Sequence, residues 1–348
     1  MDHDLAGLPI VFLSAGQGSQ YFRMGSELFR THRVFRKWLH IGDQLVRDRF
    51  GFSVIDAIEG RSRLLSDPFD ALPATHPAIF LTQYALAQVL HHHGIFPDSA
   101  LGVSLGETVA MTVAGMLSFE PALLSVAEQP AVFSRTCAPG AMVSVLADPH
   151  LHASNPVLAA HSELAGNGAE GHFVLSAPAV ALPAIDVELE RLGVPHQTLP
   201  VPFAFHSRWI EPSEHAYRLA TAALHLREPR WPVISTALRR RSGPHGFELR
   251  RDELFWRIVR EPMRVREMLL GIEAMGGAVY VDLSPSGTLA GLARRAIPAG
   301  SPSRVFPLLT PFGEDLRCIA RLLDAIRPAG GPPLQSGLTA DSMSGRAS

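Results

Sequence analysis

A strand, a sharp turn and a helix are encoded by residues 100–115, ALGVSLGETVAMTVAG. Residues 100–103 form a short apolar run, and residues 107–115 are small residues that suit a helix packed closely on a sheet. The turn between them, GVSLG at residues 102–106, has the pattern G-x-S-x-G. Glycines two residues either side of a serine let the chain turn tightly and expose the hydroxyl group, so Ser104 is a candidate nucleophile. The backbone N–H of Leu105 would then face a developing oxyanion.

The elements around this turn predict an α/β fold. We expect buried strands at residues 8–13, 233–237 and 278–283, and helices at residues 77–93 and 289–297. The pattern changes at residue 140. Three strand candidates follow, at residues 141–147, 173–176 and 196–201, together with a helix at residues 183–192. This change predicts a small α+β subdomain at residues 140–202, inserted into a large α/β domain of residues 1–139 and 203–327. Residues 328–348 are rich in Gly, Pro and Ser, which predicts a disordered tail.

The composition is that of a globular protein with a sizeable core. Of the 348 residues, 47% are hydrophobic and the formal net charge is −2, so no basic excess indicates a nucleic acid or a membrane surface as partner. No stretch reaches the roughly 18 apolar residues of a membrane helix, and the N-terminus lacks the basic start of a signal peptide. We therefore expect a cytoplasmic protein.

Metal and disulfide chemistry are both disfavoured by the sequence. Cys137 and Cys318 are the only cysteines and have no CxxC spacing. The run His91-His92-His93 has no carboxylate or cysteine nearby in the sequence, so we interpret it as a solvated helix end and expect no metal site.

Four segments then match one family in order. They are GQGSQ at residues 16–20, GVSLGE at 102–107, AFHS at 204–207 and, more loosely, DLSPSG at 282–287. In these segments, over roughly residues 8–325, the chain resembles the malonyl-CoA:acyl-carrier-protein transacylases and the acyltransferase domains of polyketide synthases. The resemblance implies an α/β-hydrolase-like large domain with an inserted small ferredoxin-like α+β subdomain.

The resemblance also implies catalytic roles. Ser104 would be the nucleophile and His206 its general base, and a backbone carbonyl near Ser235 or Thr236 would orient the imidazole. Without the resemblance, His206 is one of sixteen histidines, and a buried structural role would be favoured over a catalytic one.

An oxyanion hole, a substrate and a partner are implied as well. Gln17 would build the oxyanion hole together with the N–H of Leu105. The partner would be an acyl carrier protein, and its phosphopantetheine arm (or coenzyme A) would serve as the substrate handle, with no bound cofactor. The resemblance favours a monomer. The basic clusters that could meet an acidic carrier protein are Arg239–Arg241, Arg250–Arg251 and Arg294–Arg295.

One departure from the family concerns the acyl pocket. Malonyl-transferring members place an arginine 25 residues after the serine, a position that is Gln129 here (104 + 25 = 129). A guanidinium pairs with the free malonyl carboxylate, whereas a glutamine would leave that carboxylate buried without a counter-ion. We expect Gln129, Phe203, Phe205 and Val103 to line the acyl pocket, and Gln129 to disfavour malonyl there, although Phe203 to His206 (FAFH) resemble a pattern associated with malonyl selection.

Three functions remain open. The first, which we favour, is a proofreading acyl hydrolase that resembles the stand-alone acyltransferase-like hydrolases of polyketide synthases whose acyltransferases act in trans. The second is a trans-acting transferase for an acetyl, longer acyl or succinyl-like unit. The third is a non-catalytic module that binds carrier proteins. The sequence leaves the acyl chain, the carrier protein and the choice between water and a thiol as acceptor undetermined.

Overall fold

The computed structural model describes residue 5 and residues 7–326, so the predicted tail at 328–348 lies outside the described residues. The larger sheet has the strand order β10-β9-β1-β2-β7-β8. Every neighbouring pair is parallel except β7 and β8. In that order the strands are Arg304–Pro307, Val279–Asp282, Ile10–Ser14, Ser99–Gly102, Val233–Ser235 and Arg240–Arg241. The predicted strands at residues 8–13, 233–237 and 278–283 are confirmed in this sheet.

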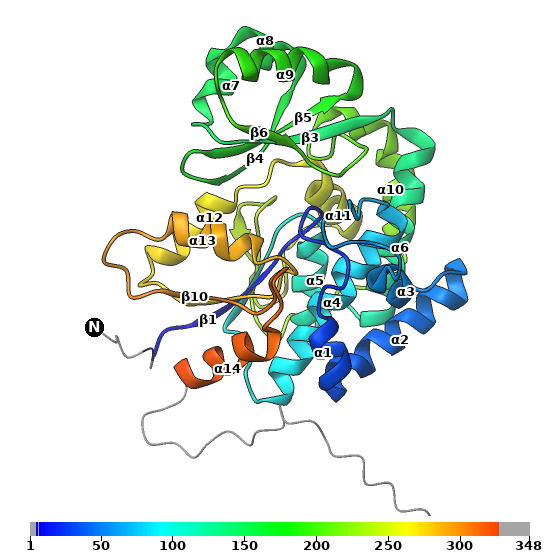
Figure 1. The fold of residues 1–348 in the computed structure, drawn as a ribbon, viewed down its shortest axis with the longest axis vertical. Helices are drawn as coiled ribbons and strands as arrows, with labels where there is room; N and C mark the ends of the chain where they lie inside the picture. Colours follow the sequence, from blue (N-terminus) through cyan, green and yellow to red (C-terminus); the bar gives the residue numbers. More distant parts are fainter. Residues whose placement is uncertain (1–4, 6, 327–348) are drawn as a thin grey trace, which may run out of the picture.

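Helices surround this sheet (Figure 1), and α4, α5 and α6 pack against one another beside it. Helix α4 is buried on nearly every face, which explains why its sequence is apolar all round. The helices of this part are α1 (Ser26–Thr31), α2 (Arg33–Phe50), α3 (Val54–Glu59), α4 (Leu72–His92), α5 (Leu105–Val113), α6 (Phe119–Thr136), η2 (Arg208–Ser213), α10 (Glu214–Thr221), α11 (Arg251–Arg260), α12 (Val265–Glu273), α13 (Thr288–Ala296) and α14 (Asp315–Ala325).

A second, antiparallel sheet has the order β4-β5-β3-β6. Its strands are β4 (Glu163–Ala169), β5 (His172–Pro178), β3 (Gly140–Val145) and β6 (His196–Thr198), and its helices are α7 (His150–Ser154), α8 (Pro156–His161), η1 (Ala179–Ala181) and α9 (Leu182–Arg191). Three of these strands were predicted. The fourth, β4, was missed because its sequence, ELAGNGA, has small residues in place of an apolar run.

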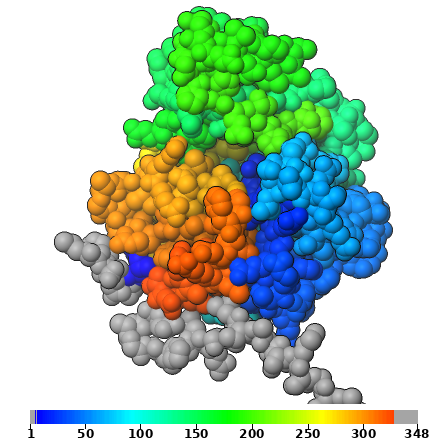
Figure 2. Space-filling view, in the orientation of Figure 1, coloured from blue at the N-terminus to red at the C-terminus, as the bar shows by residue number. Residues whose placement is uncertain are grey.

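The two faces of the second sheet pack against different parts of the protein. Val143 and Val145 of β3 point toward the helices, where they form a separate small core with Phe173 and Leu175 of β5. Met142, which alternates with them, belongs to the core of the larger part. The green lobe of the second sheet and its helices therefore sits on the blue and orange surface of the larger part (Figure 2).

Membrane-spanning helices and metal-binding clusters can be searched for in the described residues. Between residues 7 and 326, no helix is both long and apolar enough to cross a membrane. Nor do three His, Cys, Asp or Glu side chains of that range gather where a metal ion could be held. The histidine run ends α4 as predicted, but His91 is only partly solvated because its ring stacks on Phe96 and contacts Trp231.

Candidate active site

Ser104 sits at a strained turn between β2 and α5. Its backbone has φ 56° and ψ −126°, a conformation that residues other than glycine rarely adopt. A Cβ on Gly102 would lie 2.3 Å from Cα of Glu107, and one on Gly106 would lie 2.0 Å from the carbonyl oxygen of Ser14. Both glycines of the G-x-S-x-G pattern are therefore required by close backbone contact, and the turn presents Ser104 at the carboxyl end of the parallel sheet.

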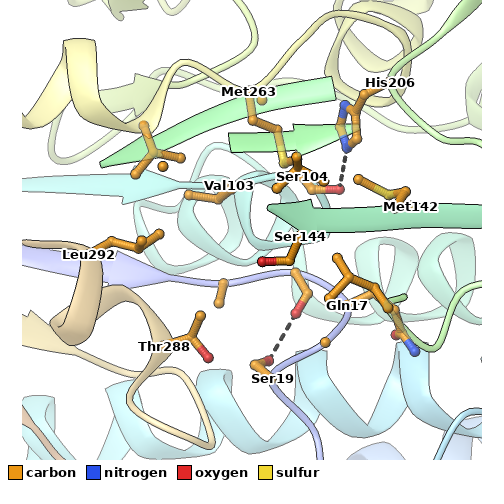
Figure 3. A pocket seen from close by; sticks show the side chains of 18 of the residues that line it. Gln17, Ser19, Val103, Ser104, Met142, Ser144, His206, Met263, Thr288 and Leu292 are labelled. Atoms are coloured by element: carbon orange, nitrogen blue, oxygen red, sulfur yellow. Dashed lines mark hydrogen bonds between the residues drawn. The ribbon is translucent and has the colours of Figure 1, made fainter. Parts of the chain in front are cut away.

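His206 faces Ser104 from a second strained position. Its φ is 60°, and its backbone N–H donates to the carbonyl of Val259 at 2.9 Å. The distance from Nε2 of His206 to Oγ of Ser104 is 2.9 Å (Figure 3). Nδ1 lies 2.8 Å from the carbonyl oxygen of Glu261, which can only accept, so Nδ1 carries the proton and Nε2 is free to accept one from Ser104.

The surroundings of His206 favour its neutral imidazole. Burial lowers the pKa of His206 to about 4; the hydrogen bond to Glu261 acts in the opposite direction, and the charge of Arg260 lowers it again. Only 1% of the residue is exposed. The ring is thus held in the state that can take a proton from the serine hydroxyl group.

The predicted orienting carbonyl near Ser235 or Thr236 is wrong, because Glu261 at the end of α11 provides it. Ser235 and Thr236 instead donate their hydroxyl groups to the buried carboxyl group of Glu107, at 2.5 and 3.0 Å. Burial raises the pKa of Glu107 to about 7, against the effect of these hydrogen bonds. These hydrogen bonds join the first turn of α5 to the end of β7, and they stabilise the turn at Ser104 that precedes α5.

The GQGSQ loop lies against the same turn. A Cβ on Gly16 would lie 3.0 Å from Cβ of Ser104 and 3.2 Å from the N of Leu105. The side-chain amide of Gln17 is bonded to the hydroxyl group of Thr75, with Nε2 at 2.9 Å. Because that side chain is engaged, the contribution that we predicted for Gln17 to an oxyanion hole would have to come from its backbone N–H, alongside the unpaired N–H of Leu105 at the first position of α5.

A buried glutamine holds this loop in place. Gln83 of α4 accepts a hydrogen bond from the N–H of Ala15 at 2.8 Å and donates one to its carbonyl at 2.9 Å. The side-chain amide thus pairs both backbone polar groups of Ala15, as a neighbouring strand would, at the point where β1 ends. Neither Gln83 nor Glu261 was predicted. Glu261 acts through its carbonyl, which every residue has, and Gln83 lies 66 residues from Gln17 (83 − 17 = 66) in a segment that reads as ordinary helix.

A cavity of about 190 Å³ opens above the two side chains, between the two sheets (Figure 3). The larger part contributes Gln17, Val103 and Phe205, and the second sheet contributes its inward face, including Met142 and Ser144. No lysine or arginine is among the described residues that line this cavity. Val103 and Phe205 are thus found where we expected them.

Two predicted pocket residues, Gln129 and Phe203, lie outside this lining. Nε2 of Gln129 donates to the hydroxyl group of Tyr217 of α10 at 3.0 Å. Phe133, one turn further along α6, packs edge-on against Phe205 and also contacts Tyr217, with ring centroids 4.9 and 5.4 Å apart. These aromatic contacts run from Phe205, which lines the cavity, through Phe133 to Tyr217 beside Gln129, and Phe203 belongs to the same packing. Tyr217 was not predicted, because its role depends on contact with a distant helix.

The chain matches the family model of the acyl transferase domain over residues 11–328. It belongs to this family. Its relatives include the polyketide biosynthesis acyltransferase homolog BaeD of Bacillus velezensis, which is 41% identical over 91% of this chain and 97% of that protein. PksD of Bacillus subtilis, which has the same description, is 37% identical over 89% of this chain and 94% of its own length. Among solved structures, the acyltransferase domain from the second module of the salinomycin polyketide synthase aligns with a TM-score of 0.77 at 26% identity, over 91% of this chain and 73% of that one.

Proposed function

We propose that this protein hydrolyses acyl thioesters on an acyl carrier protein in polyketide biosynthesis, through an acyl-Ser104 intermediate. The observation that carries the proposal is the pairing of Ser104 and His206 beside a cavity whose described lining has no cationic side chain. The kinship with polyketide biosynthesis acyltransferase homologs supports the carrier protein as partner. The order of the strands in the two sheets supports an α/β-hydrolase-like part with a ferredoxin-like insert at residues 140–202.

Acylation would proceed in two proton transfers. Nε2 of His206 takes the hydroxyl proton as Oγ of Ser104 attacks the thioester carbonyl carbon. The carbonyl oxygen becomes an oxyanion that the N–H groups of Gln17 and Leu105 would stabilise. When the tetrahedral intermediate collapses, the C–S bond breaks, and the departing sulfur takes the proton back from His206. The products are an ester on Ser104 and the free thiol of the carrier arm, and no bound cofactor is needed.

Deacylation would repeat these steps with water. His206 removes a proton from the water molecule, the resulting hydroxide attacks the ester carbonyl, and Oγ of Ser104 leaves with the proton from His206. The acid is released and the enzyme returns to its starting state. If a second phosphopantetheine thiol attacked in place of water, the same residues would transfer the acyl group.

The walls of the site support neutral acyl groups as substrates. A malonyl carboxylate in the cavity would meet no lysine or arginine among the described lining residues, and a buried unpaired charge costs several kcal/mol. Position 129, where the malonyl transferases that the sequence resembles place an arginine, carries a glutamine that is bonded to Tyr217 and lies outside the described cavity lining, so it offers a malonyl carboxylate no cation. An enzyme without this anchor would be unsuited to loading malonyl but suited to removing stalled neutral acyl groups.

The second candidate is transfer of a neutral acyl unit, which the same wall also permits. Intact-protein mass spectrometry of an acetyl-loaded carrier protein, with and without an unloaded carrier protein as acceptor, separates the two. Hydrolysis predicts loss of the acetyl mass as free acetate whether or not the acceptor is present. Acetyl mass on the acceptor, with little free acid, would establish transfer instead. A malonyl-loaded carrier protein is the matched probe, and we expect its turnover to be at least about tenfold slower.

A further inference from the structure

Helix α13 forms one wall of the cavity beside Ser104. Thr288, Leu289 and Leu292 of this helix line the cavity (Figure 3), and the proposed mechanism gives none of them a role. Leu292 also reaches the second sheet, because a Cβ on Gly168 of β4 would lie 3.1 Å from its Cδ2. The position of α13 therefore determines where this wall of the cavity stands.

Helix α13 begins without a side-chain cap of its own. Its N-cap residue is Gly287, which has no side chain and a left-handed backbone with φ 67°. The first N–H groups of a helix have no partner within the helix, so they need acceptors from outside it. A serine, threonine, aspartate or asparagine at the N-cap normally supplies one of them. In α13 such an acceptor has to come from another element.

Asp282, the last residue of β9, supplies this acceptor. Its Oδ2 accepts a hydrogen bond from the N–H of Ala290 at 2.6 Å, and its Oδ1 accepts one from the N–H of Ser284 at 2.8 Å. Ala290 is the third residue of α13, the position to which a capping side chain normally bonds. One carboxyl group thus holds both the turn that follows β9 and the first turn of the helix.

The ionised carboxyl group is suited to this role. Asp282 has no exposed surface, and burial raises its pKa to about 6, while the hydrogen bonds from Ser284 and Ala290 act in the opposite direction. Above that pKa both oxygens accept, and the helix dipole favours negative charge at the start of a helix. An asparagine of the same shape would pair only one of the two N–H groups, since its NH₂ group would face the other.

The larger sheet fixes Asp282 relative to Ser104. Asp282 of β9 lies beside Leu13 of β1, and Leu13 lies beside Leu101 of β2. Strand β2 ends at Gly102, directly before the turn that carries Ser104. The wall formed by α13 and the nucleophile are therefore both anchored at the same edge of three adjacent strands.

We propose that Asp282 is a positioning residue, which holds α13 where its leucines can pack against the acyl chain of the substrate. This inference rests on the proposed function, since it concerns the acyl group that Ser104 would receive. The apolar side chains of Leu289 and Leu292 suit a hydrocarbon chain, which gains free energy by burial against them. An acetyl group is too short to gain much from this wall. A displaced α13 should therefore weaken the binding of long chains more than that of acetyl.

The test measures kcat and KM separately for p-nitrophenyl acetate and p-nitrophenyl hexanoate. In Asp282→Asn we expect the kcat/KM ratio of hexanoate to acetate to fall about fivefold, mainly through a higher KM for hexanoate. Leu292→Ala, which removes part of the wall directly, should lower the same ratio. If Asp282→Asn does not fold, Asp282→Glu takes its place, because it keeps the charge but shifts the oxygens, and its ratio should fall at least about twofold.

Asp43→Asn is the matched control. Asp43 is a buried carboxylate that accepts a hydrogen bond from the N–H of Ile55 at 3.0 Å, in the first turn of α3. No residue of α3 is among the described residues that line the cavity. This variant should lose stability as Asp282→Asn does, but its ratio should equal that of wild type.

Two results would overturn the positioning role. One is a wild-type ratio in the folded Asp282 variant, and the other is an equal fall of the ratio in the Asp43 variant. The proposed function would stand in either case, as long as wild type forms an acyl-Ser104 ester with these substrates. If wild type formed no such ester with either substrate, the proposed function itself would fail.

Discussion

Two regions meet at Ser104 and are built differently. The region around the serine and His206 is held by the backbone: glycines in close contact, two strained residues, and a carbonyl that fixes the imidazole. The region around Gln129 is held by side chains, namely one hydrogen bond to Tyr217 and a group of packed aromatic rings. Backbone geometry tolerates few substitutions, whereas side-chain packing can be refilled at modest cost. Under the proposed function, the first region would hold the catalytic pair by its backbone, whereas the second region could be substituted without disturbing that pair.

The largest expected effect tests the first region at its centre. Ser104→Ala should lower kcat by at least about 10⁴-fold and abolish the acyl-enzyme, because Oγ of Ser104 is the hydroxyl oxygen that lies 2.9 Å from Nε2 of His206. The acylated protein mass after mixing with acetyl-pantetheine is the measurement. Ser134→Ala, which alters an exposed serine of α6, is the control and should behave as wild type. A persisting acylated mass in the Ser104 variant would assign the nucleophile elsewhere.

The second test asks whether the close contact between Gly106 and the backbone of Ser14 excludes a side chain at position 106. Gly106→Ala places a Cβ 2.0 Å from a backbone oxygen, so we expect the free energy of unfolding to fall by about 3 kcal/mol or more. Gly271→Ala, in helix α12, has no atom within 4 Å of its new Cβ and should gain about 0.5–1 kcal/mol. Urea unfolding measures both. Equal stabilities of the two variants would contradict the account of the turn.

The third test uses pH. Since burial lowers the pKa of His206 from 6.5 to about 4, the neutral base is present above about 4. The acylation rate should be flat near neutrality and fall about tenfold per pH unit below that pKa. The contribution of His206 to folding stability has the same sign: it is fully present above 6.5 and is lost as the pH falls through about 4. Burst kinetics with p-nitrophenyl acetate after a pH jump measure the rate. An acid limb near 6.5 would show an unperturbed histidine.

The smallest expected effect on activity concerns the second region. Gln129→Arg should give no measurable gain in malonyl turnover, because this position lies outside the described lining of the cavity. The partly buried guanidinium, which would lose the hydrogen bond to Tyr217, should instead lower the free energy of unfolding by about 1–3 kcal/mol. The assays are malonyl-loaded carrier protein turnover and urea unfolding, and Gln44→Arg on the exposed face of α2 is the control. A clear rise in malonyl turnover would show that one charge alone separates this chain from malonyl-transferring relatives.

Much of the fold could be predicted from local patterns. The strand and helix around Ser104, the parallel strands of the larger sheet and the change at residue 140 each have a signature in neighbouring residues. Strand β4 was missed because packing against the segment at Met263, and not its own apolar content, makes it a strand. Pro130 lies inside α6 without ending it. A buried histidine, His76, hydrogen-bonds to the backbone of Val126, four residues before the proline.

The sequence by itself determined the residues that the proposed chemistry requires, namely Ser104 in its glycine turn and His206, and it determined that residue 129 is neutral. Only the tertiary structure decided that the carbonyl of Glu261 holds the imidazole, that Gln129 faces Tyr217, and that the carboxyl group of Asp282 caps α13. The physical reason is that the residue type fixes the chemistry of a side chain, whereas every residue has the same backbone carbonyl. Which backbone groups meet which side chains depends on contacts between segments far apart in the chain.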